Sequence, residues 1–172
     1  MAVFFTVLFG GVLAASAGAW ISRSTKISEF RQAWIDNLTK DISEFVGVAE
    51  RWFRKFDEIN GIPDAEKILR KRDELFPIAD EARVILRRIR LRFNPRSNQY
   101  KTEDDALLKH LADLLNPDLL NPDRLGPDNP EFRWHTLADQ AVEHAREVLK
   151  REWEVTKRPR LPLCDAIRKC LG

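Results

Sequence analysis

The stretch that decides the fold is ISEFRQAWIDNLTKDISEFVGVAERWFRKFDEI, residues 27–59. Its apolar residues recur every three or four positions, which places them on one face of a helix. This seam consists of Ile27, Phe30, Trp34, Leu38, Ile42, Phe45, Ala49, Trp52, Phe56 and Ile59. Charged residues between them, such as Asp36, Asp41 and Glu44, are expected to form solvated flanks. The pattern predicts one long amphipathic helix, ended by the Gly61-Ile62-Pro63 signal.

Before this helix lies the uncharged run AVFFTVLFGGVLAASAGAWI, residues 2–21. Its 20 residues are the length that a helix needs to cross a hydrocarbon layer of about 30 Å. Trp20 stands where an interfacial aromatic residue belongs, and Arg23 and Lys26 follow it. Positive charge on that side favours a cytoplasmic location for the rest of the chain. Residues 1–22 are therefore predicted to be a transmembrane anchor, with no break in the helix after it.

A cleaved secretory signal peptide is the alternative interpretation of the same run. Ala15-Ser16-Ala17 and Ala17-Gly18-Ala19 both fit a small-x-small cleavage site. No basic side chain precedes the run, however, and positive charge follows it, which opposes translocation of the remainder. The anchor is the preferred interpretation.

Small residues form two neighbouring lines along the predicted span. One line holds Gly10, Ala14 and Gly18, and the other holds Gly11 and Ala15. Such lines let two helix backbones approach closely in lipid, although small residues are also simply tolerated there. We expect the span to associate with itself or with another membrane protein.

The rest of the chain is predicted to be all-helical. Three further helices are expected at about 64–93, 103–115 and 131–157, the first of them capped by Asp64 and kinked or divided by Pro77. Residues 116–130 contain four prolines and are expected to be a connector, in which each Asn-Pro-Asp fits a turn that launches a short helical turn. Residues 23–158 should thus form a cytoplasmic antiparallel bundle or coiled coil, followed by a basic tail at 159–172.

Composition limits the classes of partner and chemistry. The chain has 172 residues, with 29 Lys and Arg against 27 Asp and Glu, and the net charge of +2 gives no general attraction to nucleic acid. Its two cysteines, Cys164 and Cys170, do not make a disulfide framework or a C-x-x-C motif.

The densest charge cluster lies at the end of the second predicted helix. It consists of Arg83, Arg87, Arg88, Arg90, Arg92 and Arg96. If that helix folds back toward the membrane, these arginines reach the inner leaflet and contact anionic lipid headgroups. Pairing with acidic residues of neighbouring helices, such as Glu29 and Asp36, is the equally weighted alternative, and nucleic-acid binding is a minor one.

No pattern of catalytic, cofactor-binding or metal-binding residues emerges. His110, His135 and His144 are the three histidines, and no H-E-x-x-H, G-x-S-x-G or phosphate-binding glycine motif is present. The expected function is therefore a non-catalytic, membrane-anchored interaction or scaffold module that self-associates or serves a membrane complex as an accessory subunit. The alternatives are a membrane-perturbing effector or channel accessory, and an enzyme whose site would appear as histidines clustered with carboxylates.

Three short runs resemble a family of uncharacterised bacterial single-pass membrane proteins. They are KISEFRQAWI at residues 26–35, RLRFNP at 90–95 and LKREW at 149–153. In that family a similar K-I-S-E-F-R-Q-x-W-I run follows the membrane span. The resemblance covers residues 1 to about 157 and implies a location in the bacterial inner membrane. It implies no activity and no residue roles, and the tail after Arg158 departs from it.

Overall fold

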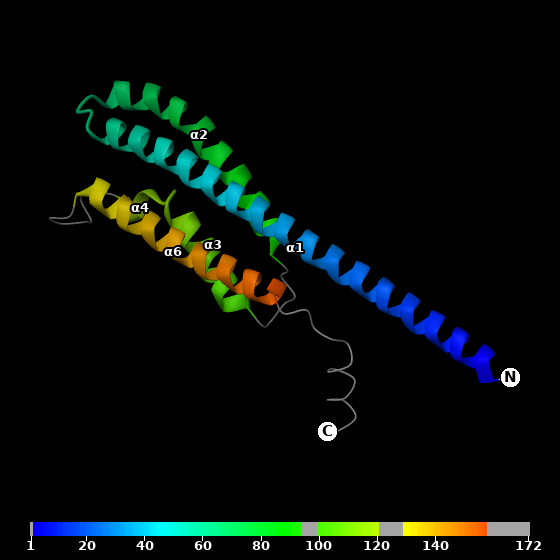
Figure 1. Cartoon of the computed structure of the whole chain (residues 1–172). Coiled ribbons are helices and arrows are strands. Elements are labelled where there is room, and N and C mark those ends of the chain that lie inside the picture. The colour runs from blue at the N-terminus through cyan, green and yellow to red at the C-terminus, as the bar shows by residue number, and fades with distance from the viewer. Residues whose placement is uncertain (1, 94–99, 121–128, 158–172) are drawn as a thin grey trace. The chain divides into compact units, whose positions relative to one another are not determined.

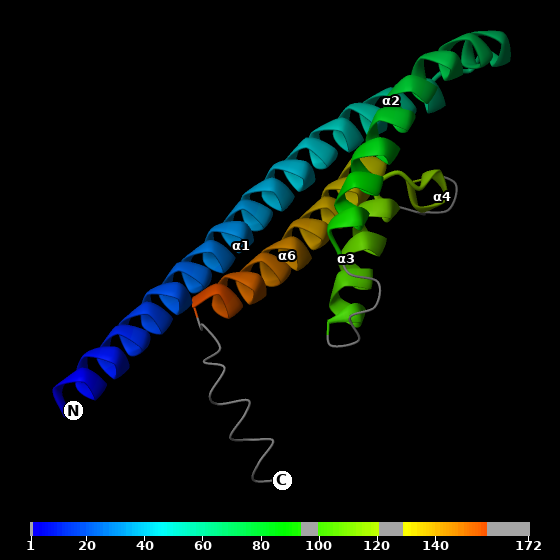
Figure 2. The ribbon, with the colours of Figure 1, turned by 90° about the vertical axis from the view of Figure 1, so that its right-hand side faces the viewer.

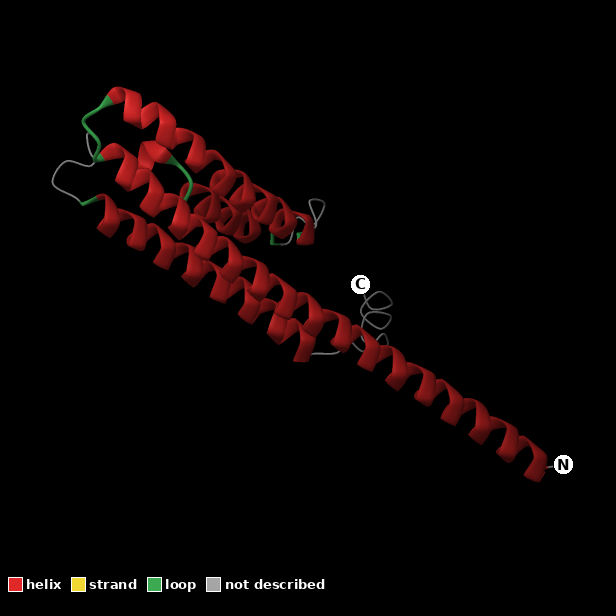
Figure 3. Ribbon diagram, turned by 90° about the horizontal axis from the view of Figure 1, so that it is seen from above, coloured by secondary structure: helices red, strands yellow, loops and turns green. Residues whose placement is uncertain are grey.

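The computed structural model describes residues 2–93, 100–120 and 129–157, without the side chains of residues 2–21, 23, 24, 65, 67 and 70. The described residues form five helices packed as a bundle and contain no strand (Figures 1 and 3), which confirms the predicted all-α class. The helices are α1 (Ala2–Asn60), α2 (Ala65–Arg92), α3 (Lys101–Asp113), α4 (Pro117–Leu120) and α6 (Pro130–Lys157).

The chain divides into two units. One unit combines Met1–Ile35 with Arg151–Gly172, and the other is the continuous segment Asp36–Lys150, which we call the bundle unit. Helices α1 and α6 each contribute residues to both units. The packing described below is that of the bundle unit.

In the other unit, α1 continues as one helix from Ala2 without a break at residues 21–27, as expected. Ile27 and Phe30 of the predicted seam are exposed there, with 48% and 76% of their surface accessible. Among the residues searched, no helix is both long enough and apolar enough to cross a membrane. The predicted span at residues 2–21 lies outside the side chains that the structure describes.

The turn between α1 and α2 is built by the signals expected from the sequence. The amide of Gly61 donates to the carbonyl of Asp57 at 3.1 Å and closes the end of α1. Asp64 then caps α2, because its Oδ1 accepts a hydrogen bond from the amide of Glu66 at 3.0 Å. The short connection makes α1 and α2 neighbours.

Ion pairs show that α1 and α2 are antiparallel. Arg51 of α1 pairs with Glu81 of α2 at 2.9 Å, and Lys55 pairs with Glu74 at 2.5 Å. One helical turn further along α1, Glu58 pairs with Lys71 of α2. Since the residue numbers rise along α1 while those of the partners fall along α2, the two helices form a hairpin. This direction agrees with the antiparallel packing that the sequence predicts for the bundle.

The core of the bundle unit is shared by this hairpin, α3, α4 and α6, and α6 runs back along α1 (Figures 1 and 2). The rings of Phe53 on α1 and Trp134 on α6 stack with centroids 5.5 Å apart. Helix α1 buries more than the predicted seam, because Val48 and Phe53 are also buried. The buried seam positions are Leu38, Ile42, Phe45, Ala49, Trp52 and Ile59.

Helix α2 continues through Pro77, so of the two expected effects of the proline, a kink or a division of the helix, the division does not occur. Proline has no amide hydrogen, and it leaves the carbonyl four residues earlier, that of Asp73, without its helical donor. Both Pro77 and Asp73 are exposed, so this carbonyl can bind water instead. On the side of α2 that faces the core, the buried residues Ala79, Ala82 and Ile85 stabilise the helix by packing.

The proline-rich connector begins with a short helical turn, as expected from its first Asn-Pro-Asp. Residues Pro117–Leu120 form α4, whose Leu120 is fully buried. Asn116 launches this turn by accepting a hydrogen bond from the amide of Asp118 at 3.0 Å, as the Asn-Pro-Asp hypothesis predicts. Asn129 caps α6 in the same way, through the amide of Glu131 at 2.9 Å. The second Asn-Pro-Asp copy lies outside the described residues.

Candidate functional site

Asp41 is the one charged residue that is buried among the described side chains, with 4% of its surface exposed. It stands on α1 between the core residues Leu38 and Ile42, so the apolar contacts of α1 fix its position. An isolated carboxylate would be costly at such a place, and a buried charge normally requires charged or hydrogen-bonding partners. The expectation that Asp41 belongs to a solvated flank is therefore wrong.

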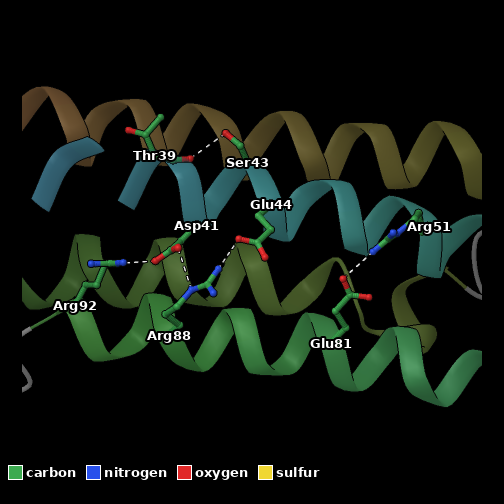
Figure 4. A network of polar contacts seen from close by, with 8 residues as sticks. All are labelled: Thr39, Asp41, Ser43, Glu44, Arg51, Glu81, Arg88 and Arg92. Atoms are coloured by element: carbon green, nitrogen blue, oxygen red, sulfur yellow. Dashed lines mark hydrogen bonds and ion pairs between the residues drawn. The ribbon is translucent and has the colours of Figure 1, made fainter. Parts of the chain in front are cut away.

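Two arginines of α2 supply those partners (Figure 4). Arg88 contacts Oδ1 of Asp41 through Nε at 2.9 Å, and Arg92 donates from Nε to Oδ2 at 2.6 Å. Arg88 also donates from Nη2 to Glu44 Oε2 at 2.5 Å. We call Asp41, Glu44, Arg88 and Arg92 the ionic quartet. It carries two positive and two negative formal charges and balances without an external ion.

Helical spacing brings the quartet together. Arg88 and Arg92 are one turn apart on α2, and Asp41 and Glu44 are nearly one turn apart on α1. The antiparallel hairpin sets the two pairs opposite each other. Because Asp41 sits within the apolar interface, this arrangement penalises a shift of one helix along the other. The quartet therefore stabilises one register of α1 against α2.

The six predicted arginines do not form one site. Arg88 and Arg92 face α1, where their partners Asp41 and Glu44 are residues that the sequence analysis did not single out. Arg83 pairs with Asp80 on its own helix at 2.8 Å. Arg87 and Arg90 are exposed, and Arg96 lies outside the described residues. Two arginines thus have an internal partner on another helix, while contact with lipid stays a prediction.

A cavity of about 450 Å³ lies beside the end of α2 and along α3. Sequence reasoning did not find it, because its residues come from α2, from Phe93 just after it and from α3, and they share no motif. Its wall mixes both signs of charge and so has no strong preference for a charged ligand. The lining residues are Arg90, Phe93, Lys101, Asp104, Asp105, Leu108, Lys109 and Ala112.

Two of the three histidines meet inside the bundle unit. The rings of His110 on α3 and His144 on α6 have centroids 4.4 Å apart and are tilted by 37°. His144 Nδ1 lies 3.1 Å from the carbonyl oxygen of Gln140. His135 is exposed and contacts the edge of Trp134. Among the described residues, no three His, Cys, Asp or Glu side chains are grouped closely enough to hold a metal ion.

The pKa of His110 is lowered from its ordinary value. Burial is the largest cause, and the positive charges that His144 and Lys109 can carry add to it, while Asp113 acts in the opposite direction. Nδ1 of His110 is buried and has no hydrogen-bond partner among the described residues. The pair is therefore held in a setting that disfavours protonation of His110.

The described side chains do not test the predicted roles of residues at the membrane. Gly10, Gly11, Ala14, Ala15 and Gly18 lie outside the described side chains, as do two of the predicted interfacial residues, Trp20 and Arg23. The third, Lys26, is exposed.

No family model, curated protein or solved structure matches this chain. The resemblance carried by residues 26–35 therefore stays an expectation. Any function has to be inferred from the chain's own residues.

The His110–His144 pair predicts a pH dependence of stability. Because the pKa of His110 is lower in the folded state than in the unfolded chain, the unfolded state binds the proton more readily. The free energy of unfolding should be at its plateau above about pH 6.5 and should fall as the pH drops below that value, by at most about 1.4 kcal/mol per pH unit from this group.

Urea unfolding of the full chain in detergent between about pH 7.5 and pH 5 measures this dependence. His110→Phe should flatten the profile relative to the wild-type chain. The matched control is His135→Gln, which changes an exposed histidine and should leave the profile unchanged. An identical profile for His110→Phe and the wild-type chain would contradict the prediction.

Proposed function

We propose that this protein is a non-catalytic interaction module, tethered to the bacterial inner membrane by residues 2–21, whose helical bundle acts as a scaffold in the cytoplasm. The observation that carries the proposal is the continuity of α1. A single helix of 59 residues leads from the uncharged N-terminal run into the ion-paired hairpin. In this proposal α1 itself connects the anchor to the bundle, and no loop lies between them.

The charge distribution supports the orientation. Arg23 and Lys26 follow the uncharged run directly. Basic residues next to a span are retained on the cytoplasmic side. The resemblance of residues 26–35 to bacterial single-pass proteins implies the same location.

The bundle unit has the properties of a rigid binding surface for other proteins. The ionic quartet fixes the register of α1 against α2. With that register fixed, the outer face of α2 keeps a constant position relative to α1. Several large apolar residues are exposed on α2 and α6, including Phe76, Leu91 and Phe132. Exposed apolar groups on a rigid helical scaffold are typical of binding surfaces for other proteins.

Membrane fractionation combined with thiol labelling tests this proposal. We expect the full chain to stay in the membrane pellet after alkaline carbonate extraction. Cys164 and Cys170 should react with a membrane-impermeant maleimide in lysed cells but not in intact spheroplasts. Mature protein found in the periplasm with Gly18 or Trp20 as its first residue would overturn the proposal.

A matched pair of charge reversals tests the orientation. The double variant Arg23→Glu, Lys26→Glu should make the two cysteines accessible in part of the spheroplast population. The control Arg146→Glu, Lys150→Glu makes the same change of charge far from the predicted span and should not alter the labelling. Equal labelling of the cysteines in the two double variants would contradict the orientation inferred from the positions of the charges.

A further inference from the structure

A line of exposed apolar side chains runs along the outer face of α2. Leu69, Phe76, Val84 and Leu91 have 64%, 55%, 59% and 86% of their surface exposed. They are seven, eight and seven residues apart, which is two helical turns in each step. The four side chains therefore lie on one side of the helix, along about 33 Å of its length.

This outer line is not part of the core. The residues of α2 that pack inward are Ala79, Ala82, Ile85 and Ile89, all of them buried. At about 100° per residue they lie on the side of α2 opposite the outer line. Helix α2 thus carries apolar side chains on two faces, of which the fold covers one.

The outer line is symmetric about Asp80. Leu69 and Leu91 each stand eleven residues from Asp80, and Phe76 and Val84 each stand four residues from it. In an antiparallel pair of two such helices centred at Asp80, each Leu69 lies opposite Leu91 of the other copy and each Phe76 opposite Val84. A two-fold axis requires self-complementarity of this kind.

Charges on the same line favour the antiparallel arrangement. Asp73 and Arg87 are each seven residues from Asp80, both are exposed, and neither forms an ion pair within the part of the chain that the structure describes. Antiparallel pairing sets Asp73 of one copy against Arg87 of the other, twice in each dimer. Parallel pairing would set Asp73 against Asp73 and Arg87 against Arg87, which is repulsive. Near the axis, Asp80 already has Arg83 at 2.8 Å.

We propose that a second copy of this chain docks on the outer line of α2, antiparallel, with the two-fold axis at Asp80. The apolar pairs contribute the attraction by burying surface, and the Asp73–Arg87 pairs select the direction and register. This inference names the partner of the proposed interaction module and so rests on that proposal.

Single-cysteine crosslinking of the full chain in native membranes tests the register. In a Cys164→Ser, Cys170→Ser background, Asp80→Cys alone should form a disulfide dimer on mild oxidation, because the two sulfurs meet at the axis. Leu69→Cys alone should not, since its two copies stand about 33 Å apart, beyond the reach of a disulfide. Coexpression of Leu69→Cys with Leu91→Cys should restore the crosslink. The control Glu147→Cys, exposed on α6, should give none.

Charge reversal provides a second readout that needs no cysteine. Asp73→Arg and Arg87→Asp, each alone, should weaken self-association measured by energy transfer between labelled chains in detergent by about tenfold. The double variant should return to within about threefold of the original affinity, because the pair is re-formed with reversed sign. Circular dichroism of each variant checks that the helices are retained.

The outcomes separate this inference from the proposed function. An absence of Asp80→Cys dimers, a crosslink from Leu69→Cys alone, or no rescue by the double reversal would overturn the antiparallel dimer. So would unchanged self-association of the Leu91→Ser variant, because the outer line would then not be the dimer surface. A chain that dimerises as described but is recovered from the periplasm would instead overturn the membrane scaffold.

Discussion

Replacement of Phe45 with alanine is expected to lower the free energy of unfolding by about 3–5 kcal/mol, one of the two largest single effects we expect in this chain. Phe45 has no exposed surface and is the largest of the fully buried side chains. Its truncation removes apolar burial and leaves a cavity that long helices, held on both sides by their neighbours, cannot easily close. Urea unfolding followed by circular dichroism in detergent measures the difference.

Phe30→Ala is the matched control. Phe30 belongs to the same predicted seam of α1, but 76% of its surface is exposed. Its replacement should change the free energy of unfolding by no more than about 0.5 kcal/mol. Comparable losses for the two variants would contradict the placement of Phe45 in the core and Phe30 outside it.

Asp41→Asn should destabilise the protein by about 2–3 kcal/mol. The amide keeps the shape of the carboxylate but leaves Arg88 and Arg92 without their buried counter-charge. Breaking a fully buried ion pair costs about 3–5 kcal/mol, and we take a lower value because 44% of the Arg88 side chain is exposed and therefore partly screened by water. The same unfolding measurement applies.

Two variants check the cause of the Asp41 effect. Glu143→Gln breaks an exposed pair with Arg146 and should cost less than about 0.5 kcal/mol. The triple variant Asp41→Leu, Arg88→Met, Arg92→Leu replaces the buried charges with apolar side chains and should recover most of the loss. If the triple variant is less stable than Asp41→Asn, the burial of uncompensated charge is not the cause.

The helices themselves were predictable from local signals. Glycine and proline after Asn60, the cap at Asp64 and the Asn-Pro turn at Asn116 each act within a few residues, so the sequence alone reveals them. The seam of α1 was predictable for the same reason, as a helical period needs no knowledge of partners.

The extent of burial was not predictable, because it depends on neighbours that are distant in the sequence. Helix α1 packs against both α2 and α6, so it buries a wider face that includes Val48 and Phe53 besides the seam. At its other end the same period continues through Ile27 and Phe30, where burial stops. Periodicity identifies a face but does not say where a partner begins.

The functional candidates depended on tertiary contacts even more strongly. Asp41 has the ordinary pattern of a surface residue, and only Arg88 and Arg92, far along the chain, explain how a carboxylate can be buried there. His110 and His144 come from different helices, and no spacing rule connects them. The sequence left open whether Pro77 kinks or divides its helix, and the helix stays undivided because packing offsets the local cost of proline.

The packing of α1 also has a consequence for synthesis. Its partner α2 follows it directly, whereas Trp134, which stacks on Phe53, is made roughly 40 residues after Arg92, or about 2–8 s later at ordinary ribosome speeds. The α1–α2 hairpin can form during this delay, but the side of α1 that later packs against α6 is still exposed to solvent. Each nascent chain therefore passes through an intermediate with exposed apolar surface on α1, which a holdase chaperone would bind. This intermediate ends when the segment around Trp134 emerges from the ribosome.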